Sequence, residues 1–340
     1  MGKIVTFGEV MLRLSPEGYN RFLQANKFEA IFGGAEANVA ISLANYGLNA
    51  EFISKVPSHE IGQMAINAIR QYGVETKNIA RGGNRLGIYY AEKGASMRAS
   101  KVIYDRANSA ISEADISDFD FDKIFEGATW FHFTGITPAL SDNCAKLCEI
   151  ACQKAHEKGL TISCDLNYRK KLWSKEKANE IMSKLAKYID VCIANEEDAK
   201  DVFGIEASNT DIYSGNLNSD GYIDVAKKMT DKFNFKAVAI TLRESYSASD
   251  NGWSGMLYID HKAYFSKKYN IHIVDRVGGG DSFGGGLIFG FESQMSPQEI
   301  IEYAVAASAL KQTIEGDINL VSKAEVTALA NGDASGRVQR

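Results

Sequence analysis

Three glycines and an aspartate stand together near the end of the chain, Gly278, Gly279, Gly280 and Asp281, between an apolar strand-like segment and an apolar helix-like segment. Without Cβ atoms the backbone can turn tightly and present its N–H groups at the positive end of the following helix, where a transferring phosphoryl group would be stabilised. A carboxylate at the mouth of such an anion site repels phosphate unless it collects a proton, so Asp281 indicates general-base activation of a hydroxyl. The alternative is a glycine-rich helix start capped by Asp281.

The composition fits a globular chain without a polyanionic partner. The 340 residues are 45% hydrophobic and 24% charged, which allows one large domain with a small appendage. The formal net charge of −5 argues against nucleic acid or an acidic membrane surface, because both need clustered positive charge. No apolar stretch approaches the ~20 residues of a spanning helix, and no charged-then-apolar leader precedes Lys3. We therefore expect a soluble, cytoplasmic protein.

The cysteines predict reduced thiols and no metal centre. Five are present, and none forms a Cys-x-x-Cys pair. Cys144, Cys148, Cys152 and His156 are spaced by four along an expected helix, as ligands might be. Twelve residues of helix extend roughly 18 Å, so these side chains cannot converge on one ion. We expect a buried face of small side chains.

Strand-like and helix-like segments alternate along most of the chain, which is typical of βαβ units. The pattern predicts a single α/β domain over residues 1–330, with a doubly wound, mostly parallel sheet flanked by helices, and a flexible tail over 331–340. The expected strands are Lys3–Phe7, Ala50–Val56, Thr129–Phe133, Leu160–Asp165, Asp190–Ala194, Lys236–Thr241, Gly255–Ile259 and Ala263–Ile273. The expected helices are Ala35–Tyr46, Ile61–Tyr72, Asp142–Lys158, Lys175–Tyr188, Tyr222–Phe233, Ser282–Phe291, Pro297–Thr313 and Lys323–Leu329, and Gly47, Gly73 and Gly159 end three of them.

Two stretches interrupt this alternation, at about residues 10–32 and 86–104. Within the second stretch, Ile88–Ala91 and Lys101–Tyr104 resemble the strands of a hairpin around a polar tip. We expect the two stretches to form a small separate β-sheet. Above the carboxyl ends of the main strands, where α/β proteins bind ligands, such a sheet could close on a substrate as a lid. The alternative is an ordinary surface excursion. Residues 208–219 are rich in Asn, Ser, Asp and Gly and are expected to form a loop.

Two motifs identify a resemblance. The chain lacks the P-loop pattern, and Phe283 stands where a dinucleotide fingerprint needs glycine. With Gly33-Gly34-Ala35-Glu36-Ala37-Asn38 near its start and Asp275-Arg276-Val277-Gly278-Gly279-Gly280-Asp281 near its end, nearly the whole chain resembles the ribokinase-like, PfkB-type carbohydrate kinases. The resemblance implies that the small sheet and the motif Gly33, Gly34 and Asn38 close over a sugar. It also implies that Asp281 takes the hydroxyl proton while the amides of Gly278 to Gly280 hold the γ-phosphoryl group of ATP.

The same resemblance implies a nucleotide side. Asn195-Glu196-Glu197-Asp198 is similar to a family motif, Asn-x-x-Glu, that organises Mg²⁺ and phosphate through water. Asp198 replaces the glutamate and is one methylene shorter, which favours Asn195 over Asp198 for this role; a solvated acidic helix start is the alternative. The family often has Thr-Leu-Gly where this chain has Thr241-Leu242-Arg243. Arg243 could reach the ATP phosphates or cover an edge of the site.

The residues expected around the sugar favour a sugar acid. Gly8-Glu9-Val10-Met11-Leu12-Arg13 ends in arginine where neutral-sugar kinases of the family commonly have aspartate, and this favours an anionic substrate. Segments around Tyr104 and Arg169 resemble 2-keto-3-deoxygluconate kinases. That resemblance implies that Arg106 and Arg169 grip a carboxylate, for which a guanidinium has two parallel donors. It further implies that Tyr89 and Tyr104 pack on the carbon chain and that Asp317 contacts its far end. The alternatives are sheet packing for the tyrosines and a structural ion pair for Arg169.

Taken together, the sequence predicts ATP- and Mg²⁺-dependent phosphorylation of the 6-hydroxyl of 2-keto-3-deoxygluconate. The alternatives are a kinase for another ketose or sugar acid, such as fructose or a deoxygalactonate epimer, and a sugar-acid-binding regulator without turnover. An exposed apolar face on the small sheet would favour a homo-oligomer, a dimer or larger, formed through that sheet.

Overall fold

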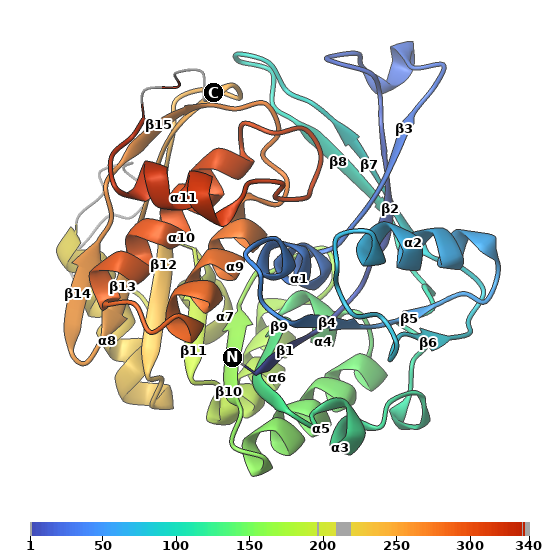
Figure 1. Cartoon of the computed structure of the whole chain (residues 1–340), viewed down its shortest axis with the longest axis horizontal. Helices are drawn as coiled ribbons and strands as arrows, with labels where there is room; N and C mark the ends of the chain where they lie inside the picture. The colour runs from blue at the N-terminus through green and yellow to red at the C-terminus, as the bar shows by residue number, and fades with distance from the viewer. Residues whose placement is uncertain (1, 196, 209–218, 335, 337–340) are drawn as a thin grey trace.

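The structure is a computed structural model, and it describes residues 2–195, 197–208, 219–334 and 336. Its centre is a mostly parallel sheet (Figure 1). In the described part of the chain this sheet has nine strands, in the order β14-β13-β12-β11-β10-β9-β1-β4, with β15 also paired to β13. The strands from β4 to β12 are parallel, whereas β13, β14 and β15 join antiparallel. They are β1 (Lys3–Phe7), β4 (Ala50–Ile53), β9 (Ala128–Thr134), β10 (Thr161–Asp165), β11 (Val191–Ala194), β12 (Ala237–Ser245), β13 (Asp250–Ile259), β14 (Lys262–Phe265) and β15 (Tyr269–His272).

Both faces of this sheet are covered by helices, because adjacent strand residues point to opposite faces and both are apolar. Ile4 and Trp130 enter one hydrophobic cluster, whereas Val5 and Phe131 enter the other. The first cluster lies under α1 (Ala35–Asn45), α2 (Glu60–Arg70), α9 (Gly279–Glu292), α10 (Pro297–Lys311) and α11 (Lys323–Ala330). The second lies under α3 (Phe121–Ile124), α5 (Asp142–Glu157), α6 (Lys175–Leu185), α7 (Asp198–Phe203) and α8 (Ser219–Phe233).

The remaining elements are short. They are α4 (Ile136–Ala139), the two-stranded pair β5 (Lys55–Val56) and β6 (Ala80–Arg81), and the 3-10 turns Phe22–Gln24, Ile116–Asp118 and Ala186–Tyr188. The expected glycine stops are confirmed, since Gly47, Gly73 and Gly159 follow helices with φ of 85°, 83° and 73°. Within the described part of the chain, no helix combines the length and the apolar character needed to cross a bilayer.

The two interrupting stretches form one small sheet, which stands away from the main sheet at the upper right of Figure 1. Its order is β3-β2-β7-β8, with a parallel central pair and an antiparallel strand on each side. The strands are β2 (Met11–Ser15), β3 (Glu29–Gly33), β7 (Gly87–Glu92) and β8 (Lys101–Asp105). The expected hairpin is therefore confirmed as β7 and β8.

Several expected boundaries are wrong, and β12, β13 and α8 are each longer than expected. Ala263–Ile273 is two strands, because β14 pairs with the end of β13 and β15 pairs with its beginning. Ala50–Val56 divides into β4 in the main sheet and β5 in a separate pair. The helix expected from Ser282 begins at Gly279, after Gly278 in a left-handed conformation. Of the expected 208–219 loop and the expected tail, residues 209–218, 335 and 337–340 lie outside the described residues.

Candidate active site

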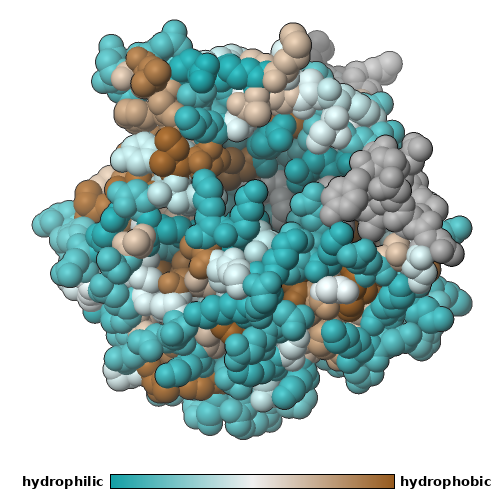
Figure 2. Space-filling model, turned by 180° about the vertical axis from the view of Figure 1, so that it is seen from behind, coloured by the Kyte–Doolittle hydropathy of each residue, from teal (hydrophilic) through white to brown (hydrophobic). Residues whose placement is uncertain are grey.

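A cleft of about 420 Å³ lies between the small sheet and the carboxyl ends of the main strands. Figure 2 shows this face of the molecule, hollowed below the small sheet, which is at the upper left in that view. The lining comes from β10 to β13, from the start of α1 and α9, and from β7 and β8. Every residue that the sequence analysis assigned to a site lines the cleft except Gly33, which ends β3 next to Gly34. Ligands of open α/β sheets bind at this end of the strands.

The glycine run forms the floor of the cleft at the N-terminus of α9. Gly278 has φ of 81°, and a Cβ there would lie 1.9 Å from the carbonyl oxygen of Asp317. This position therefore requires glycine for both its conformation and its close approach. A Cβ at Gly280, in contrast, would meet no atom within 4 Å, so its backbone faces open space. The Gly279 amide donates a long hydrogen bond of 3.4 Å to the Arg276 carbonyl oxygen, whereas Gly280 is exposed in the first turn of α9 and can offer its N–H group to an anion.

Asp281 lies in the first turn of α9 and is half-buried in the cleft. Its Oδ2 accepts a hydrogen bond of 2.7 Å from Nδ2 of Asn38. Burial raises the pKa of Asp281 to about 6, the Asn38 hydrogen bond opposes this rise, and the charge of Asp317 adds to it. A carboxylate with such a pKa is deprotonated at neutral pH and lies near the range that suits a general base.

Asn38 connects the two glycine motifs. It lies on α1 one turn after Gly34, and its Oδ1 accepts a 3.4 Å hydrogen bond from the Gly34 amide. Gly34 packs so closely on the main chain that an added Cβ would lie 1.9 Å from the carbonyl oxygen of Glu9. The start of α1 and the start of α9 are therefore held together through Asn38 and Asp281.

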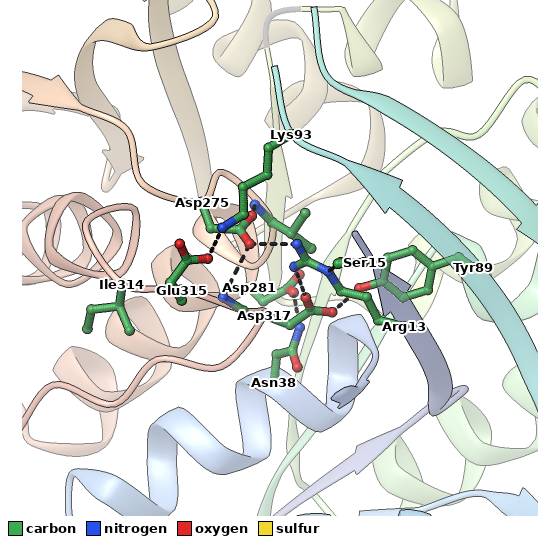
Figure 3. Close-up of polar contacts among 12 residues, drawn as sticks. Arg13, Ser15, Asn38, Tyr89, Lys93, Asp275, Asp281, Ile314, Glu315 and Asp317 are labelled. Carbon is green, nitrogen blue, oxygen red and sulfur yellow. Dashed lines mark hydrogen bonds and ion pairs between the residues drawn. The ribbon is translucent and has the colours of Figure 1, made fainter. Parts of the chain in front are cut away.

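Arg13 does not face the cleft, which corrects the argument that it favours an anionic substrate. Its side chain is 1% exposed and makes ion pairs of 2.6 Å with both Asp275 and Asp317 (Figure 3). Its Nε also donates to Oγ of Ser15. The positive charge is therefore neutralised by two carboxylates of the protein itself, and none of it is left for a ligand.

Asp317 lines the cleft, yet both its oxygens already accept hydrogen bonds. Oδ1 accepts from Arg13, and Oδ2 accepts from the Tyr89 hydroxyl of the small sheet. Next to this contact, Lys93 of the small sheet pairs with Glu315 (Figure 3). The small sheet is thus fastened to the loop that carries Asp317.

The two arginines expected to grip a carboxylate differ in their partners. Arg106 is buried, and its guanidinium donates to Oε2 of Glu9, whose Oε1 accepts from Ser109. Arg169 is half-buried, and its Nη1 donates a hydrogen bond of 3.1 Å to the Tyr168 carbonyl oxygen. Among the described residues, Arg169 has no ion pair with a carboxylate. It is therefore the better placed of the two to bind an anion in the cleft.

The two tyrosines expected around the carbon chain lie together on neighbouring strands of the small sheet. The rings of Tyr89 and Tyr104 are cross-strand neighbours with centroids 6.0 Å apart. Tyr89 is buried, whereas Tyr104 is 39% exposed. Tyr104 also stacks with Arg106, whose Cζ lies 5.4 Å from its ring centroid.

Asn195 and Asp198 cap each other at the start of α7. Asn195 Oδ1 accepts from the amides of Glu197 and Asp198, and Asp198 Oδ2 accepts from the Asn195 amide. The other Asp198 oxygen accepts from the Tyr168 amide, and burial raises the pKa of this carboxyl. No cluster of three or more His, Cys, Asp or Glu side chains with metal-binding geometry occurs in the part of the chain that the structure describes. Cys144, Cys148 and Cys152 are buried as expected, and His156 is exposed.

The far wall of the cleft carries polar groups without partners. Arg243, next to Thr241 on β12, lies over the Trp253 ring with Cζ 5.4 Å from the centroid. Nε1 of Trp253, Oδ1 of Asn251 and Nε of Arg276 are buried and have no hydrogen-bond partner. An unpaired buried donor or acceptor is costly, so these groups are available to form hydrogen bonds with a ligand in the cleft.

Sequence reasoning missed several lining residues: Asp165, Asn167, Asn251, Trp253, Arg276 and Gln312. Asp165 and Asn167 follow β10, so the rule that ligands bind at the carboxyl ends of strands could have found them. Burial and the charges of Asp198 and Asp281 raise the pKa of Asp165 well above its usual range. Asn251 and Trp253 depend on the pairing register of β12 and β13, which the sequence does not display.

Comparison with known proteins decides the family. A model of the pfkB family of carbohydrate kinases matches residues 1–324. The chain belongs to this family. The kinase is 52% identical to a 2-dehydro-3-deoxygluconokinase from Thermotoga maritima of known structure, with a TM-score of 0.94 over 97% of this chain and 98% of that one. A putative ribokinase II from E. coli, 18% identical, has the same fold with a TM-score of 0.82 over 97% of this chain and 99% of that one.

Two curated relatives differ in the sugar acid that their names give. A 2-dehydro-3-deoxygalactonokinase from Haloferax volcanii is 32% identical over 334 residues, which cover 98% of each chain. A 2-dehydro-3-deoxygluconokinase from Bacillus subtilis is 27% identical over 93% of this kinase and 91% of the relative.

Proposed function

We propose that this carbohydrate kinase transfers the γ-phosphoryl group of ATP to the 6-hydroxyl of 2-keto-3-deoxygluconate, which is also named 2-dehydro-3-deoxygluconate. The products are 2-keto-3-deoxy-6-phosphogluconate and ADP. The observation that carries the proposal is the juxtaposition, in one cleft, of the base Asp281, the open N-terminus of α9 and the unpaired Arg169. The 52% identity to the Thermotoga maritima kinase supports the choice of sugar acid.

On the sugar side, the small sheet acts as a lid. Arg169 binds the substrate carboxylate through two parallel N–H donors. Arg106, whose charge is shared with Glu9, completes this end of the site. Tyr89 and Tyr104 cover the carbon chain, and Gly33, Gly34 and Asn38 of the α1 start lie beneath it. Asp317 fixes the position of Tyr89 and borders the far end of the sugar.

In the transfer step, Asp281 accepts the proton of the 6-hydroxyl as the oxygen attacks phosphorus. The new O–P bond forms while the bond between the γ-phosphorus and its bridging oxygen breaks, and the electron pair leaves with ADP. The amides of Gly278, Gly279 and Gly280 stabilise the negative charge on the transferring group. Because Asn38 fixes the Asp281 carboxylate, the base is already oriented before the sugar arrives.

The residues on the nucleotide side fit a bound ATP·Mg²⁺ complex. Thr241, Arg243 and the glycine run would hold the phosphates, and Asn195 and Asp198 would contact Mg²⁺ through water. Both Asp198 oxygens are engaged by backbone amides, which suits an indirect role. When bound, Mg²⁺ neutralises phosphate charge, and it commonly keeps several of its waters.

An ADP-release assay over a panel of sugars and sugar acids tests the proposal. We expect turnover with 2-keto-3-deoxygluconate, loss of turnover in excess chelator, and much weaker use of fructose. No ADP release with any compound of the panel would instead favour a binding protein without turnover. A preference for fructose would contradict the sugar-acid assignment and leave the kinase assignment intact.

The galactonate epimer is a second candidate substrate. The relative from Haloferax volcanii carries that substrate in its name and matches 98% of this chain. The two sugar acids share the carboxylate that Arg169 would bind and differ in the orientation of one hydroxyl. The ratio of kcat/KM for the two epimers decides between them.

We also propose that the kinase forms a homodimer through the small sheet. Among the described residues, its edge strand β8 pairs with β7 alone, and Ile103 on it is 43% exposed. Exposed edges with apolar side chains favour pairing with a second copy. Light scattering should give the mass of a dimer for the native chain and a lower mass for Ile103→Lys.

A further inference from the structure

Arg276 occupies an unusual position between the glycine run and the small sheet. It precedes Gly278 by two residues, lines the cleft, and is half-buried. Its Nη2 donates a 3.0 Å hydrogen bond to the Ala248 carbonyl oxygen, while its buried Nε has no partner. Among the described residues, no carboxylate forms an ion pair with Arg276.

A second guanidinium lines the same wall. Arg243 lies opposite Trp253 in the register of β12 and β13 and contacts its ring. Among the described residues, Arg243 too lacks an ion pair with a carboxylate. Burial lowers the pKa of Arg276, and the charge of Arg243 lowers it further. Trp253 adds a buried N–H donor without a partner. Two mutually repelling cations and two unpaired donors in one wall are balanced by a ligand that carries several negative charges.

The contact with Ala248 connects Arg276 to the small sheet. Ala248 lies in the turn between β12 and β13, and its amide donates a 2.7 Å hydrogen bond to the Ser96 carbonyl oxygen. Ser96, between β7 and β8, donates its own amide to Oγ of Ser249 at 2.9 Å. A continuous series of hydrogen bonds therefore runs from the Arg276 guanidinium to the tip of the small sheet.

We propose that Arg276, together with Arg243, binds the phosphate chain of the nucleotide, and that Arg276 couples this binding to the position of the small sheet over the sugar. An anion at the unpaired Nε fixes the guanidinium, the guanidinium fixes the 246–249 turn, and the turn holds Ser96. Nucleotide binding then favours the covered form of the sugar site. The proposal rests on the proposed function for the identity of the two ligands.

Calorimetric binding of ADP and AMP to the full-length chain tests phosphate recognition without any turnover. AMP lacks the β-phosphate but keeps the base and the ribose. Arg276→Met and Arg243→Met should each weaken ADP binding at least tenfold, since a charge-assisted hydrogen bond is lost, and should change AMP binding far less. Equal losses for both nucleotides would mean that Arg276 only supports the fold, and unchanged ADP binding would overturn the phosphate assignment.

The coupling is measured as the ratio of sugar-acid affinities with and without a saturating non-hydrolysable ATP analogue. We expect tighter sugar-acid binding with the analogue in the native chain and a ratio near one in Arg276→Met. Ser249→Ala removes one of the two hydrogen bonds between this turn and Ser96, so it should reduce the ratio and leave ADP binding unchanged. A full ratio in both variants would overturn the coupling. Arg276→Lys, which keeps the charge and loses the fork, provides the same test if the methionine variant does not fold.

These outcomes are independent of the proposed function. If the native chain phosphorylates no sugar acid but binds ADP more tightly than AMP through the two arginines, the proposed substrate fails and the phosphate site stands. If the native chain is an active kinase and both arginine variants bind ADP normally, the phosphate site fails and the proposed function stands.

Discussion

The two halves of the cleft differ in whether their arginines are paired with carboxylates. In and behind the proposed sugar half, Arg13 is neutralised by Asp275 and Asp317, and Arg106 is neutralised by Glu9. In the nucleotide half, Arg243 and Arg276 have no carboxylate partner among the described residues. The charges of the proposed sugar half are therefore paired within the protein, while those of the proposed nucleotide half remain available to a ligand.

This difference indicates that paired arginines shape the site, whereas unpaired arginines can bind the charge of a ligand. A paired arginine holds side chains and strands in place, whereas an unpaired arginine near a cleft is available to an anion. Arg169 is the exception in the sugar half, because it has the unpaired character of the other half. The proposed binding of a sugar with one negative charge would account for this exception.

Asp281 lies where the two halves meet, and its replacement should have the largest effect. Asp281→Asn keeps the size of the side chain but cannot accept the hydroxyl proton, so kcat should fall by about 10²–10⁴. ADP release at saturating substrates measures the loss, and circular dichroism checks the fold. The matched control is Asp142→Asn, which changes an exposed aspartate in the first turn of another helix, α5. Near-native turnover in the Asp281 variant would refute the assigned base.

Arg13→Met tests whether the sugar half is a network that stabilises the fold. The change leaves two buried carboxylates without their counter-charge, so the free energy of unfolding should fall by about 3–5 kcal/mol. Urea denaturation measures this difference. Arg85→Met breaks the more exposed pair with Asp105 and should cost less than about 1 kcal/mol. If both variants lose the same small free energy of unfolding, the Arg13 network stabilises the fold no more than a surface ion pair does.

Arg169→Met tests whether the arginine without a carboxylate partner in the sugar half binds the substrate carboxylate. Loss of a charge-assisted contact worth ~1.5–3 kcal/mol should raise KM for the sugar acid by roughly tenfold to more than a hundredfold. KM for fructose, which has no carboxylate, should change far less. Arg106→Met is the comparison, because its guanidinium is paired with Glu9 and its removal should lower stability more than it selects between the two sugars. Equal weakening of both sugars by Arg169→Met would remove the charge argument.

The pH dependence of kcat/KM tests the environment of Asp281, and its effect should be smaller and graded. Because burial raises the pKa of Asp281 to about 6 and the base must be deprotonated, kcat/KM should fall about tenfold per pH unit below pH 6. With an unshifted carboxyl the same fall would begin near pH 4. Asn38→Ala removes the hydrogen bond that lowers this pKa, so the midpoint should move to higher pH. A midpoint that stays near pH 4 in both proteins would contradict the buried environment of the base.

Local patterns predicted what depends on neighbours in the sequence. The strand Lys3–Phe7 was predicted at its observed bounds, and the glycine run with Asp281 lies, as expected, at a helix start, where it lines the cleft. The helix boundary was wrong by three residues, since Gly279 and Gly280 were read as a loop although their backbone is helical. Glycine has low helix propensity, but here Ser308 of α10 donates a 2.7 Å hydrogen bond to the Gly279 carbonyl oxygen and supports this turn.

The sequence did not show which distant residues form ion pairs. Arg13 was expected to favour an anionic substrate, but it is paired with carboxylates that are 262 and 304 residues away in the chain. Likewise, Arg106 and Glu9 are 97 residues apart. An unpaired arginine and a paired one look identical in a sequence, and only the fold decides which carboxylates come within reach.

The ion pair between Arg13 and Asp317 also has a consequence for biosynthesis. It joins the second strand of the protein to a loop near its end, across 304 residues. At the usual pace of translation, ~5–20 residues per second, roughly 15 to 60 s separate the synthesis of the two partners. During that interval the arginine, destined for the interior, has no counter-charge from Asp317. A nascent chain that stops early therefore cannot assemble the sugar half, and incomplete products remain recognisable to chaperones and proteases.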